Sequence, residues 1–156
     1  MKRLAFFLLF VAGVATSCTK TIGTDSVTPA VDPRDRLVGT YTIGYNVVVR
    51  FGSRVTNPET YTGTLGVSKL QATNQLTLDF DAPGIKEKQT AQLTDSTFTI
   101  IDKKTQPIVV NGTTYTGQYS ANGLFLREGG QQKMTYTGVS EDTDLKLVIT
   151  MTGAKK

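Results

Sequence analysis

The chain has 156 residues, with 17 basic and 13 acidic side chains, a formal net charge of +4, a single cysteine and no histidine. The lack of histidine excludes the commonest general base and metal ligand, and it leaves neither zinc sites built on His and Cys nor nucleophiles activated by histidine. The basic residues are scattered and form no stripe, which argues against nucleic-acid binding.

The first 17 residues are typical of an export signal. Two basic residues precede an apolar run over residues 4–16, which is shorter than the roughly 20 residues of a membrane-spanning helix. Small residues stand directly before Cys18. This arrangement resembles the lipobox of bacterial lipoproteins, in which the chain is cut before the cysteine and its thiol is acylated. We therefore expect residues 1–17 to be a signal peptide and Cys18 to be the lipidation site.

The cysteine count agrees with this expectation. Cys18 has no second cysteine as a disulfide partner, and a free thiol is a liability in an oxidising compartment. Several acyl chains on one residue would hold the protein on a membrane more firmly than a single chain can. The residue after the lipidated cysteine is Thr19, whereas an aspartate at this position is linked with inner-membrane retention. The resemblance therefore implies an outer-membrane lipoprotein, with palmitate among its lipids.

Residues 18–36 are predicted to be the lipidated cysteine and a flexible tether. Thr, Ser, Asp and Pro dominate this stretch, and no apolar period is long enough to form an element. A coil of this length spans roughly 20–25 Å from end to end. The remaining residues, 37–156, are enough for one domain with its own core.

Alternation of apolar and polar residues predicts a series of short strands in this domain, and no segment has helical spacing. In chain order the predicted strands are 41–51, 61–67, 76–81, 85–93, 97–100, 114–119, 124–128, 133–137 and 145–152.

Turn residues are predicted to separate these strands. They lie at 73–74, 82–84, 94–95, 111–112, 122–123 and 129–130, and several are Asn-Gly or Gly-Gly pairs that suit tight hairpins. Short successive turns favour an all-β fold with a single antiparallel, up-and-down barrel of eight to nine strands, because closure removes the sheet edges. A β-sandwich is the alternative.

Several segments resemble the small lipocalin-like (calycin-like) lipoproteins of Gram-negative bacteria. They are the VGTY motif at 38–41, LTLDF at 76–80, DSTFTI at 95–100 and YTGQYSANGLFL at 115–126. The resemblance covers roughly residues 37–153. It implies an eight-stranded barrel in the cell envelope, and it brings no established activity.

Six tyrosines fall on the predicted buried face, where each hydroxyl needs a hydrogen-bond partner. They predict either rings around a small apolar ligand or a solid barrel that the rings fill. A cavity of a few hundred Å³ with tyrosine at its rim would favour ligand binding. The candidate ligand-binding residues are Tyr41, Tyr45, Tyr61, Tyr115, Tyr119 and Tyr136.

The carboxylates offer little chemistry. Asp79 and Asp81 alternate on one strand but are best explained as solvated residues before a turn, and the acidic loop at 141–144 lacks the ligand spacing of a calcium loop. We therefore predict no catalytic residue, metal site or cofactor, and no enzyme. Two functions remain: an envelope protein that binds a small apolar ligand, or a solid barrel that docks another envelope protein.

Overall fold

The computed structural model describes residues 31–156, which form ten strands and no helix. The strands are β1 (Gly39–Phe51), β2 (Arg54–Val55), β3 (Glu59–Lys69), β4 (Gln75–Ala82), β5 (Ile85–Thr94), β6 (Thr97–Ile100), β7 (Thr105–Val110), β8 (Thr113–Glu128), β9 (Gln131–Asp142) and β10 (Leu145–Lys155). No stretch of residues 31–156 forms a helix with the length and hydropathy that crossing a bilayer requires.

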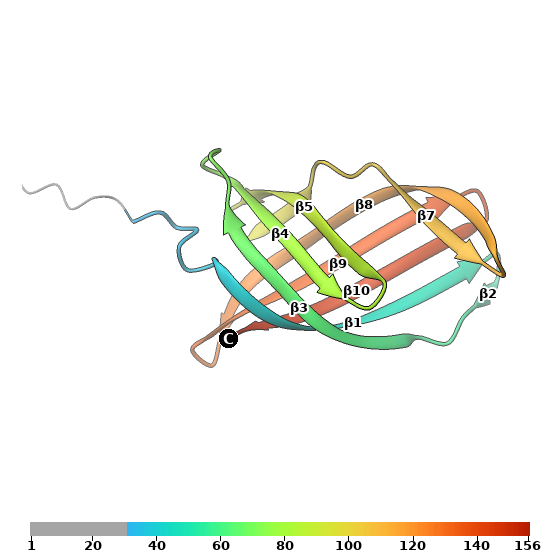
Figure 1. Cartoon of the computed structure of the whole chain (residues 1–156), viewed down its shortest axis with the longest axis horizontal. Helices are drawn as coiled ribbons and strands as arrows, with labels where there is room; N and C mark the ends of the chain where they lie inside the picture. The colour runs from blue at the N-terminus through green and yellow to red at the C-terminus, as the bar shows by residue number, and fades with distance from the viewer. Residues whose placement is uncertain (1–30) are drawn as a thin grey trace, which may run out of the picture. The chain divides into compact units, whose positions relative to one another are not determined.

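Eight of the strands form a closed antiparallel barrel (Figure 1). The sheet runs β1-β3-β4-β5-β6-β8-β9-β10, and β10 pairs with β1 along most of its length, from Tyr41↔Lys155 to Phe51↔Leu145. The other two strands are additions: β2 pairs with β1, and β7 pairs with β8. The predicted all-β barrel is confirmed, and the β-sandwich alternative is wrong because the sheet closes on itself.

The inward-facing residues of the alternating strands make the core. Tyr41, Leu65, Leu76, Leu78 and Ala91 have no exposed surface. Burial of each large apolar side chain contributes roughly 1.5–3 kcal/mol, so one continuous core stabilises residues 31–156.

Two of the predicted turns have the backbone that tight two-residue hairpins require. Gly129 and Gly130 both have positive φ, at 59° and 81°, as do Asn111 and Gly112, at 50° and 78°. Such pairs of left-handed residues match the twist of the flanking strands.

The turn predicted at residues 122–123 is wrong, because both residues lie inside the long strand β8. Gly123 stands opposite Phe98 of β6. A Cβ at Gly123 would lie 2.6 Å from Phe98 Cε1 and closer still to Cζ. The glycine therefore makes room for an aromatic ring from the neighbouring strand.

Strand β7 was not predicted. Pro107 interrupts it, and its apolar residues are adjacent, Ile108 to Val110, so period-two alternation is weak. Proline is confined to edge strands because it has no N–H to give to a neighbour. Only pairing with β8 makes this segment a strand.

The compact unit begins at Val31, six residues before the predicted start of the domain. Arg34 is buried, and its Nη1 donates to the carbonyls of Leu70, Ala72 and Gln75. These bonds hold the segment before β1 against the β3–β4 loop. The predicted signal peptide, the lipidation site Cys18 and most of the tether lie outside the described residues.

Candidate ligand-binding site

The barrel wall has an opening between β5 and β7. The later part of β8 pairs with β6, which in turn pairs with residues 91–94 of β5. The first part of β8 pairs instead with β7. Within residues 31–156 no ladder joins β7 to residues 85–90 of β5. The backbone of Thr90 bonds instead to Ile101 and Asp102 in the β6–β7 loop, so residues 85–89 are the part of the β5 edge that has no strand partner at this opening.

Both edges are protected against pairing with another strand. Leu93 N of β5 donates to Asn74 O on the β4 side, so the backbone groups of the odd-numbered residues of β5 point toward β4. The backbone N–H and C=O groups of Lys86 and Lys88 therefore point the other way, toward the opening. The bond from Tyr119 N to Lys104 O likewise directs position 107 of β7 away from β8. That position is Pro107, which has no N–H to offer to another strand. Lysines on the edge of β5 and proline on the edge of β7 therefore hinder pairing with a strand of another molecule.

A pocket of about 270 Å³ lies at this opening. Its apolar wall comes from β4 and β10, through Phe80, Ile149 and Met151. Its polar lining comes from β5, the β6–β7 loop, β7, β8 and β9 and includes Glu87, Gln89, Lys103, Gln106, Tyr119 and Tyr136. The pocket therefore offers both an apolar and a hydrogen-bonding surface.

Two tyrosines and a glutamine form a buried hydrogen-bond network in this pocket. Tyr136 Oη donates to Gln89 Oε1 at 3.0 Å, and Gln89 Nε2 donates to Tyr119 Oη at 3.3 Å. The two tyrosine hydroxyls also bond to each other. Burial raises the pKa of both tyrosines above the ordinary value, most strongly for Tyr136. Both hydroxyls are therefore neutral donors and acceptors at physiological pH.

Lys103 closes the network on its outer side. Its Nζ lies 2.6 and 2.9 Å from the two carboxylate oxygens of Glu87 and 4.5 Å from the centroid of the Tyr119 ring. Glu87 Oε1 also accepts a bond of 2.7 Å from Gln89 Nε2. A continuous polar chain thus runs from the buried Tyr136 to a lysine in the β6–β7 loop.

Gly138 provides space for the two tyrosines. A Cβ at this position would lie 3.1 Å from Tyr119 Oη and 3.1 Å from Tyr136 Cε1. These distances are tighter than ordinary contacts, so a side chain here would require the two rings to shift.

The six tyrosines predicted as ligand-binding residues do not come together. Tyr119 and Tyr136 share the pocket, whereas the other four lie elsewhere. Tyr41 Oη donates to Leu37 O at 2.8 Å, Tyr45 Oη to Pro83 O and Tyr61 Oη to Glu59, and the Tyr115 ring is only half-buried. Tyr41 and Tyr45 are therefore buried rings that fill the barrel, and the hydroxyls of Tyr41, Tyr45 and Tyr61 bond locally.

Sequence reasoning missed Glu87 and Gln89. Both occupy odd positions of the 85–93 pattern, and these positions face inward with Ala91. Polar residues on a face predicted to be buried are informative because they need partners there. That signal was present in the sequence, whereas the approach of Lys103 depends on a loop whose path no local pattern predicts.

The carboxylates noted in the sequence lie on the outer surface. Asp79 and Asp81 of β4 form ion pairs with Lys88 and Lys86 of β5, at 3.3 and 3.2 Å, and all four side chains are at least half exposed. Among residues 31–156 there is no group of three or more potential metal ligands.

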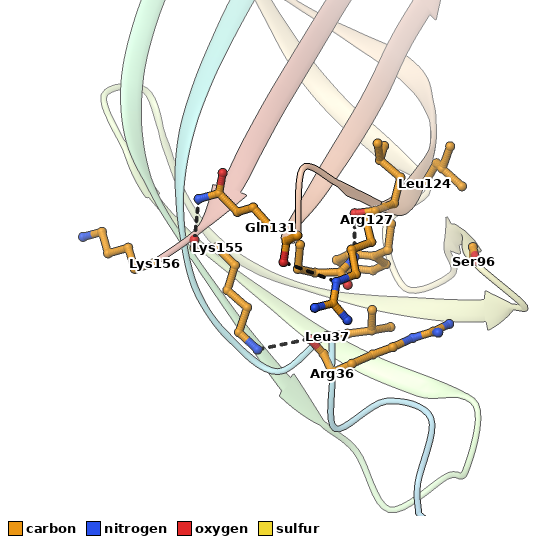
Figure 2. A pocket seen from close by; sticks show the side chains of 12 residues that line it. Arg36, Leu37, Ser96, Leu124, Arg127, Gln131, Lys155 and Lys156 are labelled. Atoms are coloured by element: carbon orange, nitrogen blue, oxygen red, sulfur yellow. Dashed lines mark hydrogen bonds between the residues drawn. The ribbon is translucent and has the colours of Figure 1, made fainter.

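A second, larger hollow of about 640 Å³ lies at the end of the barrel where β1 begins (Figure 2). Its lining includes Leu37, Phe125 and the side chains of four basic residues, Arg36, Arg127, Lys155 and Lys156. We call it the cationic pocket.

The comparisons with known proteins name no family for this chain. No family model matches it, and no curated protein matches it. Two solved structures of proteins of unknown function are similar, one from Bacteroides ovatus and one of the DUF3598 family from Nostoc punctiforme. Each is 13% identical, with TM-scores of 0.44 and 0.43 and coverage of 76% and 78% of this chain. The chain spans only 41% and 48% of their lengths.

Proposed function

We propose that this protein is a lipocalin-like lipoprotein of the bacterial cell envelope, anchored through lipid on Cys18, whose barrel binds a small and largely apolar ligand. The observation that carries the proposal is the pocket of about 270 Å³ lined by Tyr119 and Tyr136. Pockets that combine an apolar wall with a few convergent polar groups are typical ligand sites.

The pocket volume limits the size of the ligand. A water molecule occupies about 30 Å³ of the liquid, so 270 Å³ corresponds to roughly nine waters. A single ring or a short acyl chain fits this space, and a long-chain fatty acid does not. The apolar part would lie against Phe80, Ile149 and Met151, and one polar group would reach the network of Gln89, Tyr119 and Tyr136.

Residues 31–156 suit a direct test, because all the pairings of the barrel and its core lie within them. Native mass spectrometry of this segment would be run with indole, octanoate and palmitate as probes. We expect a mass shift with indole or octanoate and none with palmitate. A barrel that gains no mass with any probe would contradict ligand binding and favour docking to another envelope protein.

Two neighbouring positions on β7 provide a matched pair of variants. Gln106 faces the pocket and is half-buried, whereas Thr105 is exposed on the outer face of the same strand. Gln106→Trp should fill the pocket and abolish probe binding, and Thr105→Trp should leave it unchanged. Equal loss in both variants would mean that the probes bind somewhere else.

A further inference from the structure

The cationic pocket gathers basic side chains from three parts of the chain. Arg36 precedes β1, Arg127 lies near the end of β8, Lys155 is the last residue of β10, and Lys156 follows it. In Figure 2 the guanidinium of Arg127 is drawn above Leu37, between Lys155 and Arg36. No acidic side chain is among the residues that line this pocket. The Lys156 side chain extends away from the other three in Figure 2, so three positive charges, on Arg36, Arg127 and Lys155, share one concave surface without an acidic side chain in its lining.

The four basic side chains are also free of ion pairs within residues 31–156. Seven other basic side chains in the same part of the chain form ion pairs with carboxylates. Glu128, next to Arg127, is bonded to Lys133 at 2.7 Å. The charges of the cationic pocket thus remain available to a ligand.

Hydrogen bonds hold two of the donors of this pocket, Arg127 and Lys155, in place. Arg127 Nε donates to Gly130 O at 3.2 Å, which orients the guanidinium, and within residues 31–156 its two terminal nitrogens donate no hydrogen bond. Lys155 Nζ donates to Arg36 O at 3.1 Å, which ties the end of β10 to the segment before β1. The buried side chains of Leu37 and Phe125 form the floor. A planar guanidinium with free terminal nitrogens matches the geometry of phosphate oxygens.

We propose that the cationic pocket binds a phosphate group, through Arg36, Arg127 and Lys155. A phosphate fits because its charge needs several donors at once and its oxygens accept bidentate bonds from arginine. The group could belong to a lipid headgroup or to a free phosphate compound. The chain enters the barrel at this pocket, and Arg36 stands 18 residues after Cys18 in the sequence. This site is separate from the ligand pocket between β5 and β7, so each proposal can fail without the other.

The test uses residues 31–156, which lack Cys18 and so cannot join a membrane through its lipid. Binding of inorganic phosphate would be followed by amide chemical shifts. Vesicles of equal parts phosphatidylglycerol and phosphatidylcholine would be compared, by co-sedimentation, with vesicles of phosphatidylcholine alone. We expect saturable shifts at Ser96 and at residues 127–132, and sedimentation only with the anionic vesicles.

A double variant with a charge-matched control separates a site from general attraction. Arg36→Gln with Arg127→Gln removes two charges from the cationic pocket. Arg50→Gln with Arg54→Gln removes two exposed charges from the β1–β2 hairpin, about 40 Å away along β1. The first pair should weaken phosphate binding by roughly tenfold or more, since charge-assisted bonds are the strong ones. The control pair should change it by about twofold at most.

Arg127→Lys adds a variant that keeps the charge and the fold but loses the planar fork, and it should weaken binding to an intermediate degree. If the variants of the cationic pocket weaken binding of both inorganic phosphate and the anionic vesicles, the proposal is supported and the phosphate group belongs to a lipid headgroup. The same dependence for inorganic phosphate alone would support it with a free phosphate compound as the ligand. Equal weakening by both double variants, or no saturable binding of either probe, would overturn it.

Discussion

The buried network of Tyr136, Gln89 and Tyr119 makes a quantitative prediction about stability. Tyr136→Phe removes the hydroxyl that donates to Gln89 Oε1 and bonds to Tyr119. The ring itself would stay packed against Phe80, with the centroids 5.5 Å apart. Gln89 is only 3% exposed, so its carbonyl oxygen would lose its partner in a place that water reaches poorly. An unpartnered buried acceptor costs roughly 1–3 kcal/mol, so we expect a loss of about 2 kcal/mol in the free energy of unfolding.

A double-mutant cycle tests the physical cause of this loss. Gln89→Leu leaves the two tyrosine hydroxyls bonded to each other and should cost about 1–2 kcal/mol. The double variant has no Gln89 carbonyl to leave without a partner. The free energy of unfolding that it loses should therefore be smaller than the sum of the two single losses by about 1–2 kcal/mol. Tyr115→Phe, on a half-buried ring outside the network, should stay within about 0.5 kcal/mol of the wild type.

Urea unfolding of residues 31–156 measures these values. With a slope of roughly 2 kcal/mol per molar, a loss of about 2 kcal/mol moves the midpoint by about 1 M. Additive losses, with a coupling free energy below about 0.3 kcal/mol, would refute the reasoning, because Gln89 would then have found another partner. In that case the three side chains would not depend on one another for their hydrogen bonds.

Three further outcomes follow from other features. Cys18→Ala should abolish labelling with palmitate and free the protein from membranes, and a variant that stays membrane-bound would contradict the anchor. Gly123→Ala should lower the free energy of unfolding by roughly 1–3 kcal/mol, because its Cβ would clash with the Phe98 ring. Adding Phe98→Leu should restore part of this loss, since the smaller side chain makes room. A Gly123→Ala variant as stable as the wild type would contradict the clash. Burial raises the pKa of Tyr41 from 10.0 to about 12, so the unfolded chain loses this proton first and stability should fall as pH rises from 10 to 12. Urea midpoints that stay level across this range would contradict that burial effect.

The barrel could be predicted because its information is local. Each strand needs only alternation at period two, and each tight turn needs only residues that accept positive φ, such as Gly129 and Gly130. Closure followed from the need to remove sheet edges. These signals do not depend on which distant segments meet, so they can be read along the chain.

The details that were missed depend on pairing across the sheet. Gly123 was predicted to be a turn residue because Asn-Gly pairs favour turns, whereas its role is to face Phe98, 25 residues earlier in the chain. The placement of the six tyrosines depends on the sheet in a similar way. All six rings lie on the predicted face. The position of each ring along the barrel determines whether its hydroxyl bonds to a carbonyl, bonds to a carboxylate or lies in the pocket.

The ligand pocket lies where two local rules are broken together. Pro107 weakens the strand pattern of β7, and Glu87 and Gln89 place polar groups on the inner face of β5. Either departure alone has an ordinary explanation, such as an edge strand or a solvated residue. Together they leave two strand edges unpaired around buried polar side chains, and a solid barrel requires neither. Departures from local consistency often mark functional sites. For this reason the pair of variants Gln106→Trp and Thr105→Trp bears most directly on what the barrel does.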